Sequence, residues 1–137
     1  MRTVVLATAT LFALANLGGD ASIGRLQGGR NMDSLRGKTL RWTFTDGPVA
    51  GMLFEHTFHD DGSVVWRILE GQGKGASKQE KHYATMRVSE DVIAVSYLAA
   101  SGHTLTVVLN FATGRVFGFA SNNTEWNPVT GTFEVVQ

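Results

Sequence analysis

The chain has 137 residues, the length of one ordinary domain. Its 12 Lys and Arg balance its 12 Asp and Glu, so it has neither the basic footprint of a nucleic-acid-binding protein nor an acidic tail. The absence of cysteine excludes disulfides, thiolate catalysis and cysteine metal sites. The 16 glycines indicate many tight turns.

The N-terminus differs in composition from the rest of the chain. Met1 and Arg2 give a short positive start, and residues 3–17 are uncharged and either apolar or small. This pattern predicts a signal peptide over residues 1–21, because the apolar run is short for a membrane span and small residues follow it. We therefore expect a periplasmic or secreted protein without a membrane span. Translation from Met32 would instead give a cytoplasmic one.

Residues 22–34 are rich in Gly, Ser, Arg and Asn and are expected to form a flexible leader. The folded domain is predicted over residues 35–137, where short apolar runs alternate with turn residues and helical periodicity is absent. The expected strands are, in chain order, residues 39–45, 51–58, 63–69, 81–88, 92–99, 104–111, 115–120 and 131–136. The segment 70–77 is predicted to be a flexible loop, and 121–130 a polar loop.

The first three predicted strands each present one aromatic face. Large rings recur at every second position, and successive side chains of a strand point to opposite faces. These positions include Trp42, Phe44, Phe54, Phe58 and Trp66. Eight short antiparallel strands predict an all-β, eight-stranded up-and-down barrel, which has room for its own side chains and one small ligand.

The ionisable residues do not form a recognisable catalytic or metal centre. The histidines are His56, His59, His82 and His103, and no pair has the spacing and shared face of a metal site. Most acidic residues fall in turns, and Glu55 should lie on the outer wall. We therefore predict no metal, no cofactor and no catalytic residue. His56 is expected to be a hydrogen-bonded interior histidine.

The aromatic residues carry the best functional signal. They are expected either to fill the barrel core or to line a small-molecule cavity together with a few polar groups. The predicted ligand-binding residues are Trp42, Phe44, Phe54, His56, Trp66, Tyr97 and Ala99.

Several short motifs resemble those of the MoaF-like calycins. They are Trp-Thr-Phe-Thr-Asp-Gly at 42–47, the pair Phe54-Glu55, Asp60-Asp61, the run Trp66-Arg67-Ile68 and the run from Tyr97 to Gly102. The resemblance covers about residues 35–120. It implies a lipocalin-like barrel, and the family name alone suggests a link to molybdenum cofactor metabolism.

The same layout is similar to that of the bacterial phenolic acid decarboxylases. That resemblance implies tyrosines that orient the substrate carboxylate, but the matching positions here are Trp42 and Phe44. Two further tyrosine positions are Phe54 and Trp66. Phe provides no hydrogen-bonding group and Trp provides one N–H, so the groups that would hold a carboxylate are reduced.

The decarboxylase glutamate, which handles the substrate phenol, falls in a Trp-x-Glu-x-x-Gly run. In this chain that run is Tyr97 to Gly102, and Ala99 takes the place of the acid. The decarboxylase arginine has Lys81 or His82 as its nearest counterpart. The resemblance therefore implies the barrel of these enzymes without their acid–base groups.

Three functional hypotheses follow. The first is non-enzymatic binding of a small apolar or aromatic molecule inside the barrel. The second is a lyase or isomerase acting on a small aromatic acid, with His56 or His82 as its base. The third is a structural or interaction module whose barrel is filled by its own side chains. The sequence predicts no nucleic-acid partner and leaves a homodimer open.

Overall fold

The structure is a computed structural model that describes residues 34–137. The predicted signal peptide and nearly all of the predicted leader lie outside the described residues. The elements are β1 (Lys38–Phe44), the 3-10 helix η2 (Gly47–Val49), β2 (Leu53–Phe58), β3 (Val64–Glu70), β4 (Ser77–Glu80), β5 (Tyr83–Ser89), β6 (Val92–Leu98), β7 (Thr104–Asn110), β8 (Arg115–Ser121) and β9 (Trp126–Val135). Within residues 34–137, no helix has both the length and the apolar character of a membrane span.

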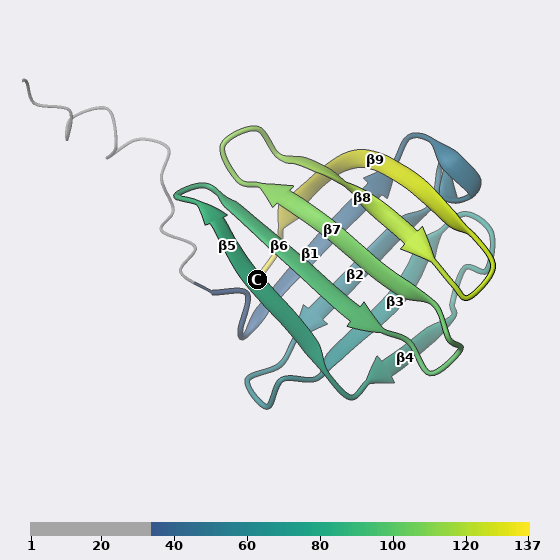
Figure 1. Ribbon diagram of the computed structural model, residues 1–137, viewed down its shortest axis with the longest axis horizontal. Coiled ribbons are helices and arrows are strands. Elements are labelled where there is room, and N and C mark those ends of the chain that lie inside the picture. The colour runs from purple at the N-terminus through teal and green to yellow at the C-terminus, as the bar shows by residue number, and fades with distance from the viewer. Residues whose placement is uncertain (1–33) are drawn as a thin grey trace, which may run out of the picture.

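The nine strands form one antiparallel sheet in the order β4-β3-β2-β1-β9-β8-β7-β6-β5. Strands that follow one another in the chain pair with each other, except for β4 and β5. In addition, the first strand, β1, pairs with the last, β9. The sheet curls into a half-barrel, with β1, β2 and β3 behind β5, β6 and β7 in Figure 1. The prediction of an all-β, up-and-down architecture is confirmed.

The prediction of eight strands is wrong, because the chain between β3 and β5 forms a ninth strand. Its residues 77–80 pair with Val64–Arg67 of β3, although three of the four are exposed and all are polar. An edge strand of this kind is held by backbone hydrogen bonds and buries little, so its sequence lacks the alternation that marks the other strands.

The last strand is also longer than predicted. It begins at Trp126 rather than at Gly131, so residues 126–130 of the predicted polar loop belong to this strand. Asn127 and Pro128 read as loop residues in the sequence, but they pair with Ala120 and Phe119 of β8. Pairing with a neighbouring strand has here outweighed local sequence preference.

Two glycines lie where the strands approach most closely. A Cβ atom at Gly118 would collide with the carbonyl oxygen of Thr106, and one at Gly131 with that of Thr43. Neither glycine needs a left-handed backbone, so the requirement is for space alone. These positions let β8 and β9 approach the neighbouring backbone closely where the sheet curls.

The half-barrel is packed with side chains over much of its interior. A cluster of buried apolar residues forms this core: Leu35, Leu40, Trp42, Phe44, Phe58, Val64, Ile93, Val95, Val107, Leu109, Val116 and Val129. Most of these come from alternate positions of β1, β6, β7 and β8, as a period of two requires.

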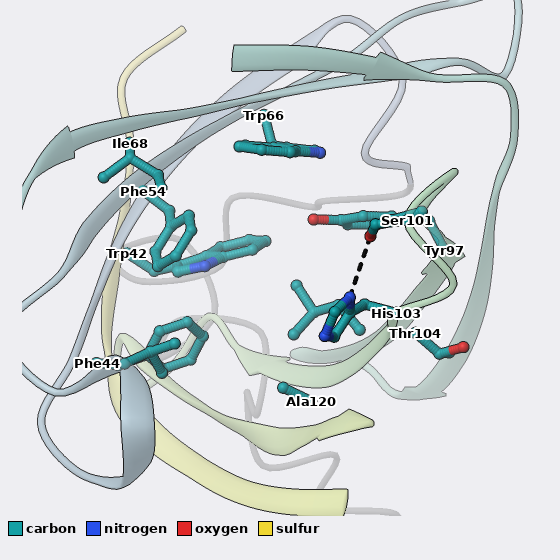
Figure 2. A pocket seen from close by; sticks show the side chains of 13 residues that line it. Trp42, Phe44, Phe54, Trp66, Ile68, Tyr97, Ser101, His103, Thr104 and Ala120 are labelled. Carbon is teal, nitrogen blue, oxygen red and sulfur yellow. Dashed lines mark hydrogen bonds between the residues drawn. The ribbon is translucent and has the colours of Figure 1, made fainter. Parts of the chain in front are cut away.

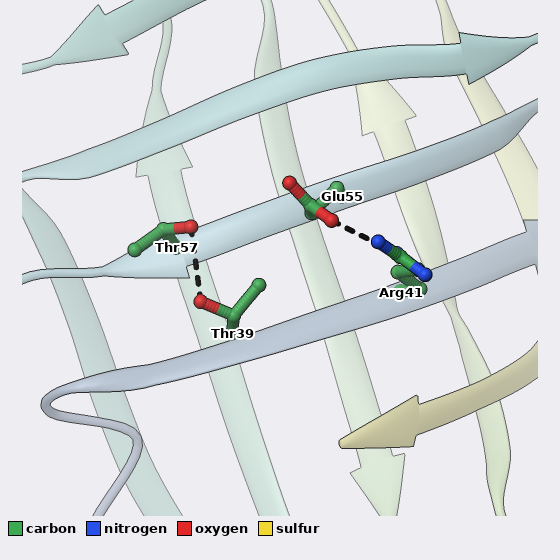
Figure 3. Close-up of polar contacts among 4 residues, drawn as sticks. All are labelled: Thr39, Arg41, Glu55 and Thr57. Atoms are coloured by element: carbon green, nitrogen blue, oxygen red, sulfur yellow. Dashed lines mark hydrogen bonds and ion pairs between the residues drawn. The ribbon is translucent and has the colours of Figure 1, made fainter. Parts of the chain in front are cut away.

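The outer wall of β1 and β2 is polar, as expected for Glu55. Arg41 donates a hydrogen bond through Nε to Glu55 Oε2 at 2.8 Å, and the hydroxyls of Thr39 and Thr57 lie 3.1 Å apart (Figure 3). Both pairs bridge the two strands. The ion pair is partly exposed, so it contributes little to stability.

Candidate functional site

A cavity of about 380 Å³ opens between the aromatic side chains of β1–β3 and the strands β6–β8 (Figure 2). Its lining is mostly apolar: Trp42, Phe44, Val49, Phe54, Trp66, Ile68, Tyr97, Ala99, Ser101, His103, Thr104, Leu105 and Ala120. The half-barrel is thus packed in one part and hollow in another.

Six of the seven predicted ligand-binding residues lie in this lining. They are Trp42, Phe44, Phe54, Trp66, Tyr97 and Ala99. Four come from alternate positions of the first three strands, and the other two lie at the end of β6 and just beyond it. Their role in binding a ligand stays a prediction.

His56 is the exception, because it lies behind the lining rather than in it. Its side chain is fully buried and stacks on Trp42, with ring centroids 3.9 Å apart. Its Nε2 lies 2.9 Å from the hydroxyl oxygen of Tyr97. Burial lowers the pKa of His56 from 6.5 to about 3, so the imidazole is neutral near pH 7. The prediction of a hydrogen-bonded interior histidine is confirmed.

Two buried nitrogen atoms beside the cavity have no hydrogen-bond partner among residues 34–137. They are Nδ1 of His56 and Nε1 of Trp42. A buried polar group without a partner costs about 1–3 kcal/mol, and such groups are scarce in folded proteins. Two unpartnered polar atoms therefore lie buried behind a mostly apolar cavity wall.

The phenol of Tyr97 is held in its neutral form. Burial raises its pKa above the ordinary value, and the nearby carboxyl of Glu80 raises it further. The hydroxyl can therefore either donate a hydrogen bond to Nε2 of His56 or accept one from it, according to the tautomer of the imidazole. Tyr97 thus places an uncharged polar group at the cavity.

Glu80 is a site residue that the sequence did not reveal. It is only 3% exposed and lies at the end of the edge strand β4. One carboxylate oxygen accepts a hydrogen bond from Trp66 Nε1 at 3.0 Å, and the other accepts one from the backbone N–H of Ala100 at 2.9 Å. Glu80 therefore ties β3 and β4 to the turn after β6, and it fixes the indole of Trp66.

Replacing Glu80 with Ala should lower the free energy of unfolding by about 2 kcal/mol, because two partly buried donors lose their carboxylate acceptor. Urea unfolding followed by circular dichroism measures this change. The matched control is Glu70→Ala, which removes an exposed carboxylate paired with Lys74 and should cost under about 1 kcal/mol. Equal losses in the two variants would contradict a bridging role for Glu80.

The mouth of the cavity carries a second polar group that sequence patterns missed. Ser101 and His103 lie in the turn between β6 and β7, where the hydroxyl of Ser101 is 3.1 Å from Nδ1 of His103. Both residues are exposed, and Thr104 adjoins them in the lining. Turn residues lack a strand period, so no sequence pattern marks their position at the cavity.

The remaining histidines lie elsewhere. His59 and His82 are exposed and contribute nothing to the lining, and the same holds for Lys81. Within the described part of the chain, no three His, Asp or Glu side chains gather into a group that could hold a metal ion.

Comparisons with known proteins agree with this architecture. One similar solved structure is described as "a putative beta-lactamase from Burkholderia vietnamiensis", with a TM-score of 0.65 and 20% identity over 74% of this chain and 95% of that one. At this identity the likeness shows the fold alone. No curated protein matches the sequence. The family description "MoaF N-terminal domain" matches residues 29–125, and the chain therefore belongs to the MoaF family.

Proposed function

We propose that this protein binds a small apolar or aromatic molecule in the cavity of a calycin-type, lipocalin-like half-barrel, without covalent chemistry. The cavity of about 380 Å³ carries the proposal, because small-molecule sites are mostly apolar hollows of about 300–1,000 Å³ with few polar groups. A barrel filled by its own side chains would leave no such volume, so the structural-module hypothesis is weaker.

The distribution of polar groups supports one chemical class of ligand. The rings of Trp42, Phe54 and Trp66 would face the apolar body of the ligand, whereas Ser101 and His103 stand at the mouth. We infer that the ligand has a ring or short apolar body and one hydrogen-bonding group. A molecule of this kind would satisfy the polar mouth without burying a charge among the aromatic rings.

The proposal can be tested with 2-naphthol, an aromatic probe with a single hydroxyl, and with a metabolite extract. Binding should change the tryptophan fluorescence and raise the melting temperature, since a hundredfold excess over the dissociation constant stabilises the folded state by about 2.7 kcal/mol. Compounds retained from the extract would be identified by mass spectrometry. No response to 2-naphthol and no retained compound would favour the structural-module hypothesis.

The alternative of a lyase or isomerase has weaker support. His82 is exposed outside the cavity, and His56 lies behind Trp42 with a pKa of about 3, which makes it a poor base at neutral pH. We predict that the protein does not decarboxylate hydroxycinnamic acids. Incubation with p-coumarate or ferulate, followed by chromatography, should match a buffer blank. Turnover clearly above the blank would restore the enzyme hypothesis.

Export from the cytoplasm is a separate proposal that rests on the N-terminal sequence. Arg2 and the uncharged run over residues 3–17 support a cleaved signal peptide. Mass spectrometry of the protein from its native source should show a new N-terminus near Ala15 or Ala21. An intact Met1, or a start at Met32, would contradict export.

A further inference from the structure

The outer face of β5–β9 exposes an unusual number of large apolar side chains. Six of them have exposed fractions between 44% and 70%: Met86, Val88, Leu98, Phe117, Phe119 and Trp126. All six lie on strands that form one half of the sheet, and β5 to β8 lie on the near side in Figure 1. Single exposed apolar residues are ordinary, but a contiguous group marks an interaction site.

The strand register shows that five of these six residues are contiguous, whereas Val88 lies at a register shift of β5 and has no cross-strand partner. Three neighbouring cross-strand rows make up what we call the apolar face: Met86, Ala94, Val108 and Phe117; then Ala84, Ser96, Thr106, Phe119 and Pro128; then Leu98, Thr104, Ser121 and Trp126. No residue in these rows is charged. The rows cross five strands and run from Phe117 to Ser121 along β8. At the usual strand spacing and rise, the face measures roughly 19 Å across the strands and roughly 13 Å along them.

The other half of the outer wall differs in its chemistry. The cross-strand neighbours on β1 and β2 include the ion pair Arg41–Glu55 (Figure 3). On β3, Arg67 pairs in register with Glu55. The same fold therefore exposes one charged wall and one uncharged wall. The apolar face is a property of β5–β9 and not of the outer surface in general.

We propose that the apolar face is the interface of a homodimer formed by two copies of this chain. A partner with charges on its surface would have to bury them unpaired against this face, whereas a second copy brings none. The formal net charge of the chain is zero, so long-range repulsion does not oppose its self-association. A standard interface buries about 800 Å² per partner, so the interface would take in these rows together with the side chains that flank them, among them the exposed Val88.

Two charges at the rim select the orientation of the second copy. Arg115 begins β8, and Glu125 lies in the turn at the other end of that strand. Both are exposed, and neither forms an ion pair within residues 34–137. A two-fold axis that lies in the interface and runs across the strands would bring Arg115 opposite Glu125 of the partner subunit. The geometry therefore points to packing with the two copies turned end for end.

The first test places a charge in the apolar face of the full-length protein. Phe119→Lys should weaken the dimer about a hundredfold in sedimentation equilibrium, because a lysine from each copy is then desolvated near the other. Ala112→Lys adds the same charge in an exposed turn outside the face and should leave the dimer intact. Trp126→Ser is a second change within the apolar face, at an exposed position, and should also weaken the dimer. Circular dichroism verifies that all three variants are folded.

The second test uses the rim charges. Arg115→Glu and Glu125→Arg should each weaken the dimer about tenfold, whereas the double variant restores the pairing and should return close to the parent affinity. A folding defect would not be rescued in this way. The proposal is overturned if the parent is monomeric at high micromolar concentration, if Phe119→Lys and Trp126→Ser stay dimeric, or if the two charge reversals add instead of cancelling. Binding of the monomer to lipid vesicles through the same residues would also overturn it.

Discussion

Acidification from pH 7 to about pH 3 should cost this protein roughly 4 kcal/mol of stability through His56 alone. The pKa of His56 is 6.5 in the unfolded chain and about 3 in the folded protein, where burial disfavours the charged imidazolium. Below pH 6.5 the unfolded state therefore binds a proton that the folded state does not. The loss begins near pH 6.5, grows by about 1.4 kcal/mol per pH unit, and is complete near pH 3.

The measurement compares the free energy of unfolding in urea between pH 7 and pH 3 for the parent and for His56→Phe. The variant keeps a ring that can stack on Trp42 but has no titrating group, so its stability should fall less steeply with pH. Other acidic groups titrate in the same range, and the difference between the two proteins isolates His56. His103→Gln is the control, because it removes an exposed imidazole.

Two results would contradict this account. Equal pH dependence in the parent and in His56→Phe would mean that His56 is protonated in the folded protein. The second result is equal pH dependence of the parent and His56→Phe only when a ligand is bound. That result would mean that the ligand supplies a partner for the imidazolium of His56. In the first case the contact between His56 and Tyr97 would have to be reassigned as a charged hydrogen bond.

The interior aromatic face was predictable from sequence because its signal is both chemical and periodic. Rings at every second position of β1, such as Trp42 and Phe44, are hidden from water only if that face is interior. The same argument predicted that Glu55 points outward. The packing of the interior was not predictable, because the position of His56 behind Trp42 depends on how strands distant in the sequence meet.

The missed features share a physical cause. Strand β4 is held by backbone pairing with β3, so its side chains carry no pattern that distinguishes strand from loop. Glu80 is buried because the curled sheet brings Trp66 and the N–H of Ala100 to its carboxylate, and these partners are distant along the chain. Ser101 and His103 line the mouth of the cavity because the turn between β6 and β7 lies there. Such features depend on closure of the whole sheet.

Replacing Ala99 with Phe should abolish binding of 2-naphthol while leaving the protein folded. Ala99 is 9% exposed and lines the cavity, so a phenylalanine ring at this position would occupy the volume proposed for the ligand. We expect the affinity to fall at least about a hundredfold, and the melting temperature without probe to stay level or rise as the ring buries apolar area. Ala100→Phe is the matched control, because it adds the same ring to an exposed neighbour in the same turn.

The same variant decides between an open cavity and a fully packed interior. In a packed interior the new ring has no space, and overpacking would lower the free energy of unfolding by about 1–3 kcal/mol. A parent protein that ignores the probe, together with a strongly destabilised Ala99→Phe variant, would show that Trp42, Phe54 and Trp66 serve only as core. A folded variant that loses binding, beside an Ala100→Phe variant that retains it, would place the ligand against Ala99 among these aromatic side chains.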